Sequence, residues 1–377
     1  MKNSESPEQS SAIGRRDFMK IGAGGAGALM TGLPAAAAAV DQPVQAWWEA
    51  HPGKEGAGKP VSIDLHTHWS PTPYTKALAD LGRPIENPYP LDYDLAKRIE
   101  WMDEHGVQVH CLTLSGAMPW QWTSSEQAAR LATIINDAGI EAHIAHPDRF
   151  LVGVELPIRD PKLALAELNR VAGKPGVRAV HLPDAMERHD YLFDAQFGDV
   201  FARIEELGYP ILFHQMDEVV NAYGGELAAG PRYLNSGLDA AIQHTIIASK
   251  LVVTGTLDRH PKLEIVLPHG GGAFPYLAGR VDHFINHFNG PEFKPTFQLA
   301  MPFKNYLRRF HYDYLIYYPE AFQFLAGLVG TDRIVVGTDL FAAKDVQYPN
   351  QVLDQFKLAP ADRERILKGN AARLLHL

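Results

Sequence analysis

The sequence predicts a (β/α)8 barrel, because eight apolar segments rich in β-branched residues alternate with segments of helical periodicity from residue 61 onward. No Gly-x-Gly-x-x-Gly motif follows the first predicted strand, which argues against the main rival, an open dinucleotide-binding sheet. Residues of metal-binding type recur where several strands end, and in a barrel these ends share one face. We therefore expect a single barrel domain over residues 61–377.

The predicted strands are short runs of apolar residues. They cover residues 61–66, 107–114, 150–156, 177–182, 210–214, 264–269, 309–314 and 334–339. The predicted helices follow the spacing of apolar residues, as in the first one, where Leu95, Ile99 and Met102 share a face. They cover residues of about 92–105, 124–146, 161–172, 196–207, 236–258, 274–288, 319–329 and 360–375. Pro360 marks the start of the last helix, since proline is favoured in the first turn.

The N-terminal segment has the features of an export signal. The stretch Gly14-Arg15-Arg16-Asp17-Phe18-Met19-Lys20 is a twin-arginine pattern, and a Gly/Ala-rich, mildly apolar stretch follows it. Pro34 and an alanine run to Ala39 offer small residues to a signal peptidase. A transmembrane anchor is the alternative, but glycine and alanine make a poor span and no stop-transfer flank follows. We expect a twin-arginine signal over residues 1–39, a lead-in over 40–60, and a periplasmic or secreted protein.

Composition excludes several classes of function. The chain has 377 residues, 46% of them hydrophobic, and a formal net charge of −9, which suits a globular protein and repels phosphate backbones. We find no basic stripe that would offset this charge, so nucleic acid is not an expected partner. Cys111 is the single cysteine, which rules out an intramolecular disulfide and a cysteine-based metal site. Its apolar surroundings in the sequence predict a small buried residue.

Five residues of metal-binding type fall at the carboxyl ends of four predicted strands. They are His66, His68, His214, His269 and Asp339. His66 and His68 leave an extended strand on one face because they are two residues apart. Each of the others alone has a structural explanation, as a core histidine, a helix cap or an N-cap. Together, at one end of a barrel, they predict a site for a divalent metal, since imidazole and carboxylate groups are natural zinc ligands.

The other histidines carry weaker signals. His181 lies within the fourth strand, one residue short of its end, and we expect at most a supporting position behind the ligands. The remaining ones are interpreted as core, helix-surface or strand residues: His110, His143, His146, His244, His283, His287 and His311.

These motifs resemble the amidohydrolase-related family, and within it the branch that contains aminocarboxymuconate-semialdehyde decarboxylase. The resemblance runs from about residue 61 to the end of the chain. It rests on the Asp-x-His-x-His strand at 64–68, the pair Phe213-His214, the run His269-Gly270-Gly271-Gly272-Ala273-Phe274-Pro275 with Gly279-Arg280, Gly337-Thr338-Asp339, and Leu367-Lys368-Gly369-Asn370-Ala371. The run at 269–275 is the most specific of these elements.

The resemblance implies roles for the site residues. His66, His68, His214 and Asp339 would bind one divalent metal, usually zinc, although other divalent metals such as Mn²⁺ also fit. His269 would be the acid–base group, which deprotonates a metal-bound water or delivers a proton to the substrate. Binuclear members of the superfamily carry a bridging lysine on the fourth strand, and the segment 177–182 has none, so a single metal is expected.

The family's substrate-binding residues have fewer counterparts in this sequence than its metal-binding residues have. The resemblance implies that Arg280 reaches the substrate carboxylate of a neighbouring subunit in a homodimer; the alternative is a surface salt-bridge arginine. Asp339 is followed by Leu340-Phe341-Ala342-Ala343, where the family usually has a different stretch, so the pocket wall differs. Arg83 is the only arginine in the segment after the first strand, and it does not align with the family's substrate-binding arginine.

Three functions are compatible with these residues. The first is a metal-dependent, non-oxidative decarboxylase of an aromatic or unsaturated carboxylic acid. The second is a hydrolase of a lactone, amide or ester, in which a metal-bound hydroxide attacks a carbonyl group. The third is a non-catalytic barrel that binds a metabolite, which the presence of all five polar site residues disfavours.

Overall fold

The structure is a computed structural model, and it describes residues 62–86, 88–115, 117–185, 191–193, 195–216, 235–287, 298–340 and 349–377. The predicted signal peptide and lead-in lie outside these residues, as do positions 341–343 of the pocket wall. Among the helices that are described, none combines the length and the apolar character needed to cross a bilayer.

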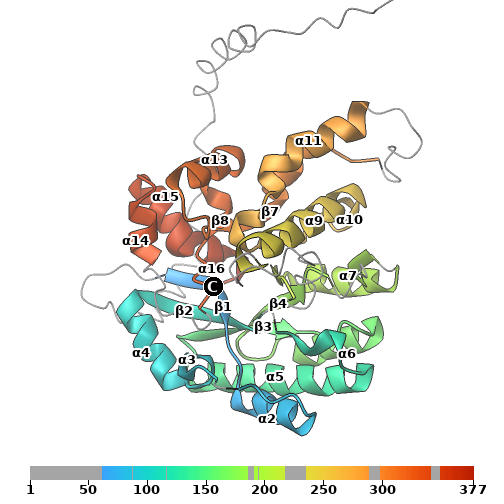
Figure 1. The fold of residues 1–377 in the computed structure, drawn as a ribbon, viewed down its shortest axis with the longest axis vertical. Helices are drawn as coiled ribbons and strands as arrows, with labels where there is room; N and C mark the ends of the chain where they lie inside the picture. Colours follow the sequence, from blue (N-terminus) through green and yellow to red (C-terminus); the bar gives the residue numbers. More distant parts are fainter. Residues whose placement is uncertain are drawn as a thin grey trace, which may run out of the picture. The chain divides into compact units, whose positions relative to one another are not determined.

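Eight parallel strands form the centre of the molecule, in the order β1 to β8 (Figure 1). They are β1 Ser62–His68, β2 Val107–Thr113, β3 Phe150–Glu155, β4 Val177–Pro183, β5 Ile211–His214, β6 Ile265–Leu267, β7 Phe310–Asp313 and β8 Ile334–Val335. Bridges from Asp64 to Val336 and from Thr67 to Leu340 join the first strand to the segment of the last, which closes the ring. The predicted (β/α)8 barrel is therefore confirmed.

Helices surround the strands in Figure 1. They are α2 Thr72–Asp80, α3 Pro90–Tyr93, α4 Leu95–His105, α5 Ser125–Ala145, α6 Pro161–Val171, α7 Gly198–Leu207, α9 Ala240–Val253, α10 Thr256–Arg259, α11 Phe274–His287, α12 Phe303–Tyr306, α13 Pro319–Val329, α14 Pro349–Asp354, α15 Pro360–Glu364 and α16 Asn370–Leu374. Their starts follow capping rules: Ser124 and Gln127 form a reciprocal capping box at α5, and Asp160 accepts two backbone N–H groups at α6.

The inside of the barrel is a separate apolar cluster. It is formed by Ile63, Leu65, Val109, Cys111, Leu151, Ala179, Leu212, Val266 and Val335, and the C-terminal residues Ala371, Ala372, Leu374, Leu375 and Leu377 pack into it. Cys111 is fully buried there, as expected. The apolar filling leaves the polar residues gathered at the carboxyl ends of the strands.

Two predicted strands end before the site residue expected on them, and one predicted helix is divided in two. β6 stops at Leu267 and β8 at Val335, so His269 and Asp339 lie in the loops that follow, with φ angles of 51° and 54°. A strand cannot continue through a residue with positive φ. The helix predicted over 236–258 is divided into α9 and α10 at Gly255, whose φ of 72° is also in the left-handed region.

Candidate metal and acid–base site

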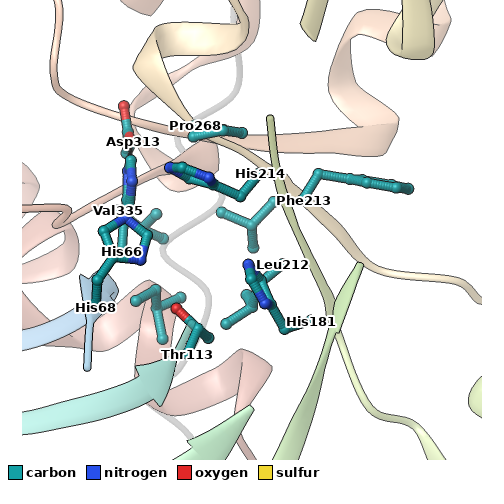
Figure 2. Close-up of a pocket in the computed structure, with 12 residues that line it drawn as sticks. His66, His68, Thr113, His181, Leu212, Phe213, His214, Pro268, Asp313 and Val335 are labelled. Atoms are coloured by element: carbon teal, nitrogen blue, oxygen red, sulfur yellow. Dashed lines mark hydrogen bonds and ion pairs between the residues drawn. The ribbon is translucent and has the colours of Figure 1, made fainter. Parts of the chain in front are cut away.

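Two histidines at the end of β1, His66 and His68, point into one cavity. Leu65, His66 and His68 all line it, although neighbours in a regular strand face opposite sides (Figure 2). The pairing of β1 with β2 has a register irregularity between Asp64 and Thr67. Such a bulge re-aims the side chains that follow it, and it accounts for the inward direction of both imidazoles.

Three imidazoles are held in the tautomer that suits a metal ligand. In each, the Nδ1 atom lies within hydrogen-bond distance of an oxygen that can only accept, so Nδ1 carries a proton and, in the neutral ring, Nε2 keeps its lone pair. The pairs are His66 Nδ1 with Asp313 Oδ2 at 2.7 Å, His68 Nδ1 with the Leu114 carbonyl at 2.7 Å, and His214 Nδ1 with the Gln215 carbonyl at 2.9 Å. Among the residues that the structure describes, the buried Nε2 atoms of His66 and His214 have no hydrogen-bond partner. This is the usual arrangement around a metal-binding histidine.

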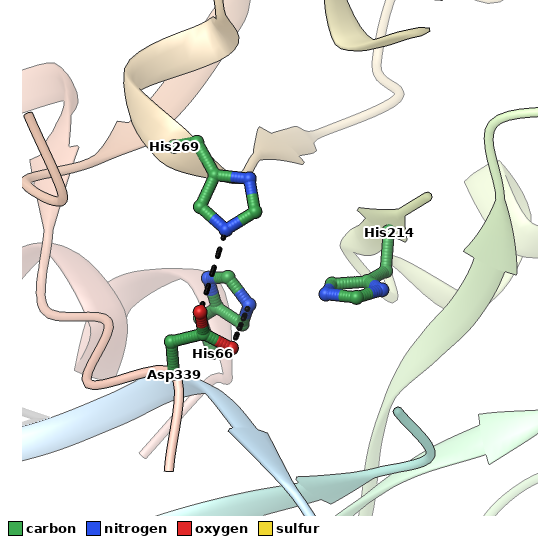
Figure 3. A group of neighbouring side chains, drawn as sticks. All are labelled: His66, His214, His269 and Asp339. Carbon is green, nitrogen blue, oxygen red and sulfur yellow. Dashed lines mark ion pairs between the residues drawn. The ribbon is translucent and has the colours of Figure 1, made fainter. Parts of the chain in front are cut away.

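These lone pairs converge on the carboxylate of Asp339. Its Oδ1 atom lies 3.5 Å from His66 Nε2 and 3.2 Å from His68 Nε2, and its Oδ2 atom lies 3.6 Å from His269 Nε2. The donor atoms of His66, His214, His269 and Asp339 all fall within 4.8 Å of one another (Figure 3). Lone pairs and an anionic oxygen repel at such distances unless a cation or a proton lies between them. The chemistry of the donor set therefore fits a divalent metal ion.

The protonation of the site supports the same interpretation. Burial lowers the pKa of His68 to about 4 and that of His214 well below its usual range, so both are neutral at pH 7. Burial opposes ionisation of Asp339, yet the neighbouring imidazoles of His269 and His66 hold its pKa well below the usual range. Burial lowers the pKa of His66, but the carboxylates of Asp313 and Asp339 outweigh this effect and raise that pKa to about 10, so this ring is protonated at pH 7 when no metal is bound. A metal ion bound here would compete with that proton.

Asp313, at the end of β7, was not singled out by the sequence. Its Oδ2 atom accepts the Nδ1–H of His66 and, at 2.9 Å, the backbone N–H of His269. Its Oδ1 atom accepts the backbone N–H groups of Gly270 at 2.9 Å and Leu315 at 3.1 Å. One buried carboxylate thus sets both the orientation of the His66 imidazole and the position of the His269 backbone. The signal that could have revealed it is a lone aspartate in the apolar run 310–314.

Asp64 joins the first strand to the loop after the last. Its Oδ1 atom accepts the backbone N–H of His66 at 3.0 Å and that of Thr338 at 3.2 Å, and its Oδ2 atom accepts the Thr338 hydroxyl at 2.5 Å. Burial raises the pKa of Asp64 to about 7, although these hydrogen bonds lower it. Asp64, the first residue of the Asp-x-His-x-His motif, therefore holds the end of β1, which carries His66, against the loop that carries Asp339.

His269 lies at the edge of the cluster and points one nitrogen away from it. Its Nδ1 atom is 2.9 Å from Nε2 of His244, and Nδ1 of His244 is 2.5 Å from Oδ2 of Asp184. His244 lies on α9 and is fully buried. The sequence interpretation had placed His244 among core, helix-surface or strand residues, and it missed this contact with the site.

His181 is buried at the same cavity, which measures about 10 Å³, room for roughly one water-sized species. Its Nδ1 atom is 2.6 Å from Glu155 Oε1, and its Nε2 atom has no hydrogen-bond partner within the described ranges. Its ring centroid lies 6.2 Å from that of His214. Figure 2 shows it lower in the view than His214, and its supporting role stays a prediction.

Arg280 is exposed on α11. Its guanidinium carbon lies 4.9 Å from the ring centroid of Phe284, four residues further along the same helix. The contact with a neighbouring subunit's substrate stays a prediction.

Known proteins resemble this chain along most of its length. The family model described as amidohydrolase matches residues 63–377. The 2-amino-3-carboxymuconate-6-semialdehyde decarboxylase of Dictyostelium discoideum is 26% identical over 332 residues, which cover 88% of this chain and 88% of that protein. The gamma-resorcylate decarboxylase of Rhizobium sp. (strain MTP-10005) is 27% identical over 287 residues, which cover 74% of this chain and 86% of that protein.

A solved structure shows the same fold. It is a dihydroxybenzoic acid decarboxylase from Polaromonas sp. JS666 with bound manganese and the inhibitor 2-nitroresorcinol. It matches with a TM-score of 0.69 at 23% identity, over 84% of this chain and 97% of that one.

Proposed function

The chain belongs to the amidohydrolase family, and we propose that it is a metal-dependent, non-oxidative decarboxylase of an aromatic or unsaturated carboxylic acid. The observation that carries the choice of a decarboxylase is the similarity to curated decarboxylases over most of their length. The site supports it, because an acid–base histidine faces a set of metal donors across the carboxylate of Asp339.

The residues divide into two groups by their chemistry. His66, His68, His214 and Asp339 would hold the divalent metal, which as a Lewis acid would bind a substrate oxygen and stabilise negative charge. His269 would deliver a proton from its Nε2 atom, which lies on the side of the cluster. In the reaction, the carbon–carbon bond to the carboxyl group breaks and CO₂ leaves. The electron pair stays on the substrate carbon, and that carbon takes the proton from His269 Nε2.

We propose zinc as the metal. Three imidazoles and one carboxylate are a donor set that suits Zn²⁺. The bound manganese of the Polaromonas structure makes Mn²⁺ the alternative to test. Elemental analysis of the purified protein distinguishes the two, and we expect about one zinc per chain. A preparation that is active only with manganese would contradict the assignment.

A substrate panel tests the proposed reaction. Protein loaded with zinc, or with manganese, would be incubated with 2,6-dihydroxybenzoate, 5-carboxyvanillate and a set of aromatic lactones and esters. We expect CO₂ release from one of the acids, and no addition of water to the lactones. Ring opening or ester cleavage without CO₂ would instead establish the hydrolase, and inertness with tight binding of one compound would favour a binding protein.

We also propose that the protein is exported through the twin-arginine pathway to the periplasm or the exterior. The proposal rests on the Arg15-Arg16 pair and the Gly/Ala-rich stretch after it. Fractionation of a bacterial host should find the mature chain outside the cytoplasm, and the conservative double variant Arg15→Lys/Arg16→Lys should retain it inside. Export of both forms to the same extent would contradict this route.

A further inference from the structure

The side chains of His269, His244 and Asp184 form a hydrogen-bonded line that leads from the proposed acid–base residue into the protein. The Nδ1 atom of His269 is 2.9 Å from His244 Nε2, and His244 Nδ1 is 2.5 Å from Asp184 Oδ2. His244 is 0% exposed and Asp184 5% exposed, so water does not compete for these contacts. Figure 3 shows the other nitrogen of His269 directed toward Asp339.

We propose that Asp184 and His244 are positioning residues that hold His269 with Nδ1 protonated and Nε2 directed at the substrate. The inference rests on the proposed function in one respect, the role of His269 as the acid–base group. Neither residue was assigned a role from the sequence, and both would act through His269 without contact to the reacting atoms.

The direction of each hydrogen bond follows from its partners. An ionised carboxylate only accepts, so Nδ1 of His244 donates to Asp184. Burial lowers the pKa of His244, although Asp184 opposes this, so the ring is neutral and its Nε2 atom carries a lone pair. His269 must then donate through Nδ1. It does so both as imidazole and as imidazolium, so only its Nε2 atom is left to exchange a proton.

Backbone packing fixes the distance between the two histidines. The loop after His269 lies directly against α9: a Cβ atom on Gly272 would come 2.0 Å from the carbonyl oxygen of Ala241. The backbone N–H of Ala273 donates to the hydroxyl of Thr245 at 2.9 Å. Ala241 and Thr245 lie in the same turns of α9 as His244. The close approach that only glycine permits at position 272 therefore brings His269 within hydrogen-bond distance of His244.

Two replacements at position 244 separate positioning from packing. In His244→Gln the side-chain oxygen can lie near the former Nε2 atom and accept the proton of His269 Nδ1, whereas His244→Leu has a similar bulk and no acceptor. With the acid that the wild type decarboxylates, we expect His244→Leu to lower kcat by about 10- to 100-fold with KM and metal content unchanged. His244→Gln should recover most of that loss. Equal kcat values in the two variants, or a change in KM or metal content alone, would overturn the inference.

A double-mutant cycle tests whether the residues act in series. Asp184→Ala alone should lower kcat, because His244 loses the acceptor that fixes its tautomer. In the His244→Leu background the same replacement should cost nothing further, since the line is already broken. Independent, additive losses would show that Asp184 does not act through His244.

A spectroscopic measurement keeps this inference separate from the proposed reaction. In zinc-loaded protein labelled with ¹⁵N-histidine, long-range ¹H–¹⁵N correlations report which ring nitrogen of His269 is protonated, with His269→Asn used to assign the signals. We expect Nδ1 protonation in the wild type and its loss in His244→Leu. If no acid is decarboxylated but this pattern is observed, the proposed function fails and the positioning stands. A neutral His269 protonated at Nε2 in the wild type would overturn the positioning, whatever the activity.

Discussion

Replacement of His269 by alanine is expected to abolish turnover while the protein keeps its metal. Removal of a general acid–base group typically costs about 10²- to 10⁴-fold in rate, and here the proton that replaces CO₂ has no other donor in our mechanism. The four proposed metal ligands remain, because His269 Nε2 faces Asp339 Oδ2 at 3.6 Å and Asp339 still has its Oδ1 atom near His66 and His68. Steady-state CO₂ release and elemental analysis of one preparation measure both quantities.

The backbone at position 269 calls for a matched control. His269 has a φ of 51°, a conformation that asparagine tolerates better than alanine does. His269→Asn should therefore be as inactive as His269→Ala but closer to the wild type in thermal stability. Loss of metal in both variants would show that His269 is itself a ligand, as its place in the 4.8 Å group allows. Substantial turnover in either one would remove His269 from the acid–base role.

The sequence predicted the gathering of the site because a barrel brings all strand ends to one face. His66, His68 and His214 needed only the position of each strand and the two-residue spacing on β1. The bulge in β1 was not visible in the sequence, yet it leaves the spacing between the two histidines unchanged. His269 and Asp339 were found although their strands end earlier than predicted, since the loops that follow still belong to the same face.

Asp313 and His244 show where the prediction stopped. For Asp313 a signal existed, a lone aspartate in the predicted strand 309–314. In the structure Phe310 and Tyr312 pack outside the barrel, so alternation directs position 313 inward. His244 had no comparable signal, because a histidine within an apolar helix pattern looks like any buried residue. Its contact with His269 depends on how closely α9 approaches the loop at Gly272, which tertiary packing decides. The left-handed φ angles of His269 and Asp339 were equally hidden, since residues other than glycine rarely adopt them.

Replacement of His214 by alanine is expected to remove the metal, and with it the activity. His214 is the only histidine of the proposed ligand set on β5, and in the described part of the chain its buried Nε2 atom makes no hydrogen bond that would give it another purpose. A metal that binds only the folded protein raises its melting temperature. Added zinc should therefore stabilise the wild type and leave the melting temperature of His214→Ala unchanged. Titration with a competing chelator gives the affinity directly.

Two further variants serve as references for the measured metal affinity, one expected to bind more weakly than the wild type and one expected to bind equally well. Asp313→Asn keeps all four ligands but weakens the acceptor of His66 Nδ1, and such outer contacts typically contribute about 10- to 100-fold to metal affinity. We expect its affinity to lie between those of the wild type and His214→Ala. His287→Ala, an exposed histidine on α11, should bind zinc as the wild type does. Wild-type affinity in His214→Ala would remove His214 from the ligand set, and an unchanged affinity in Asp313→Asn would show that the His66 imidazole is oriented without this carboxylate.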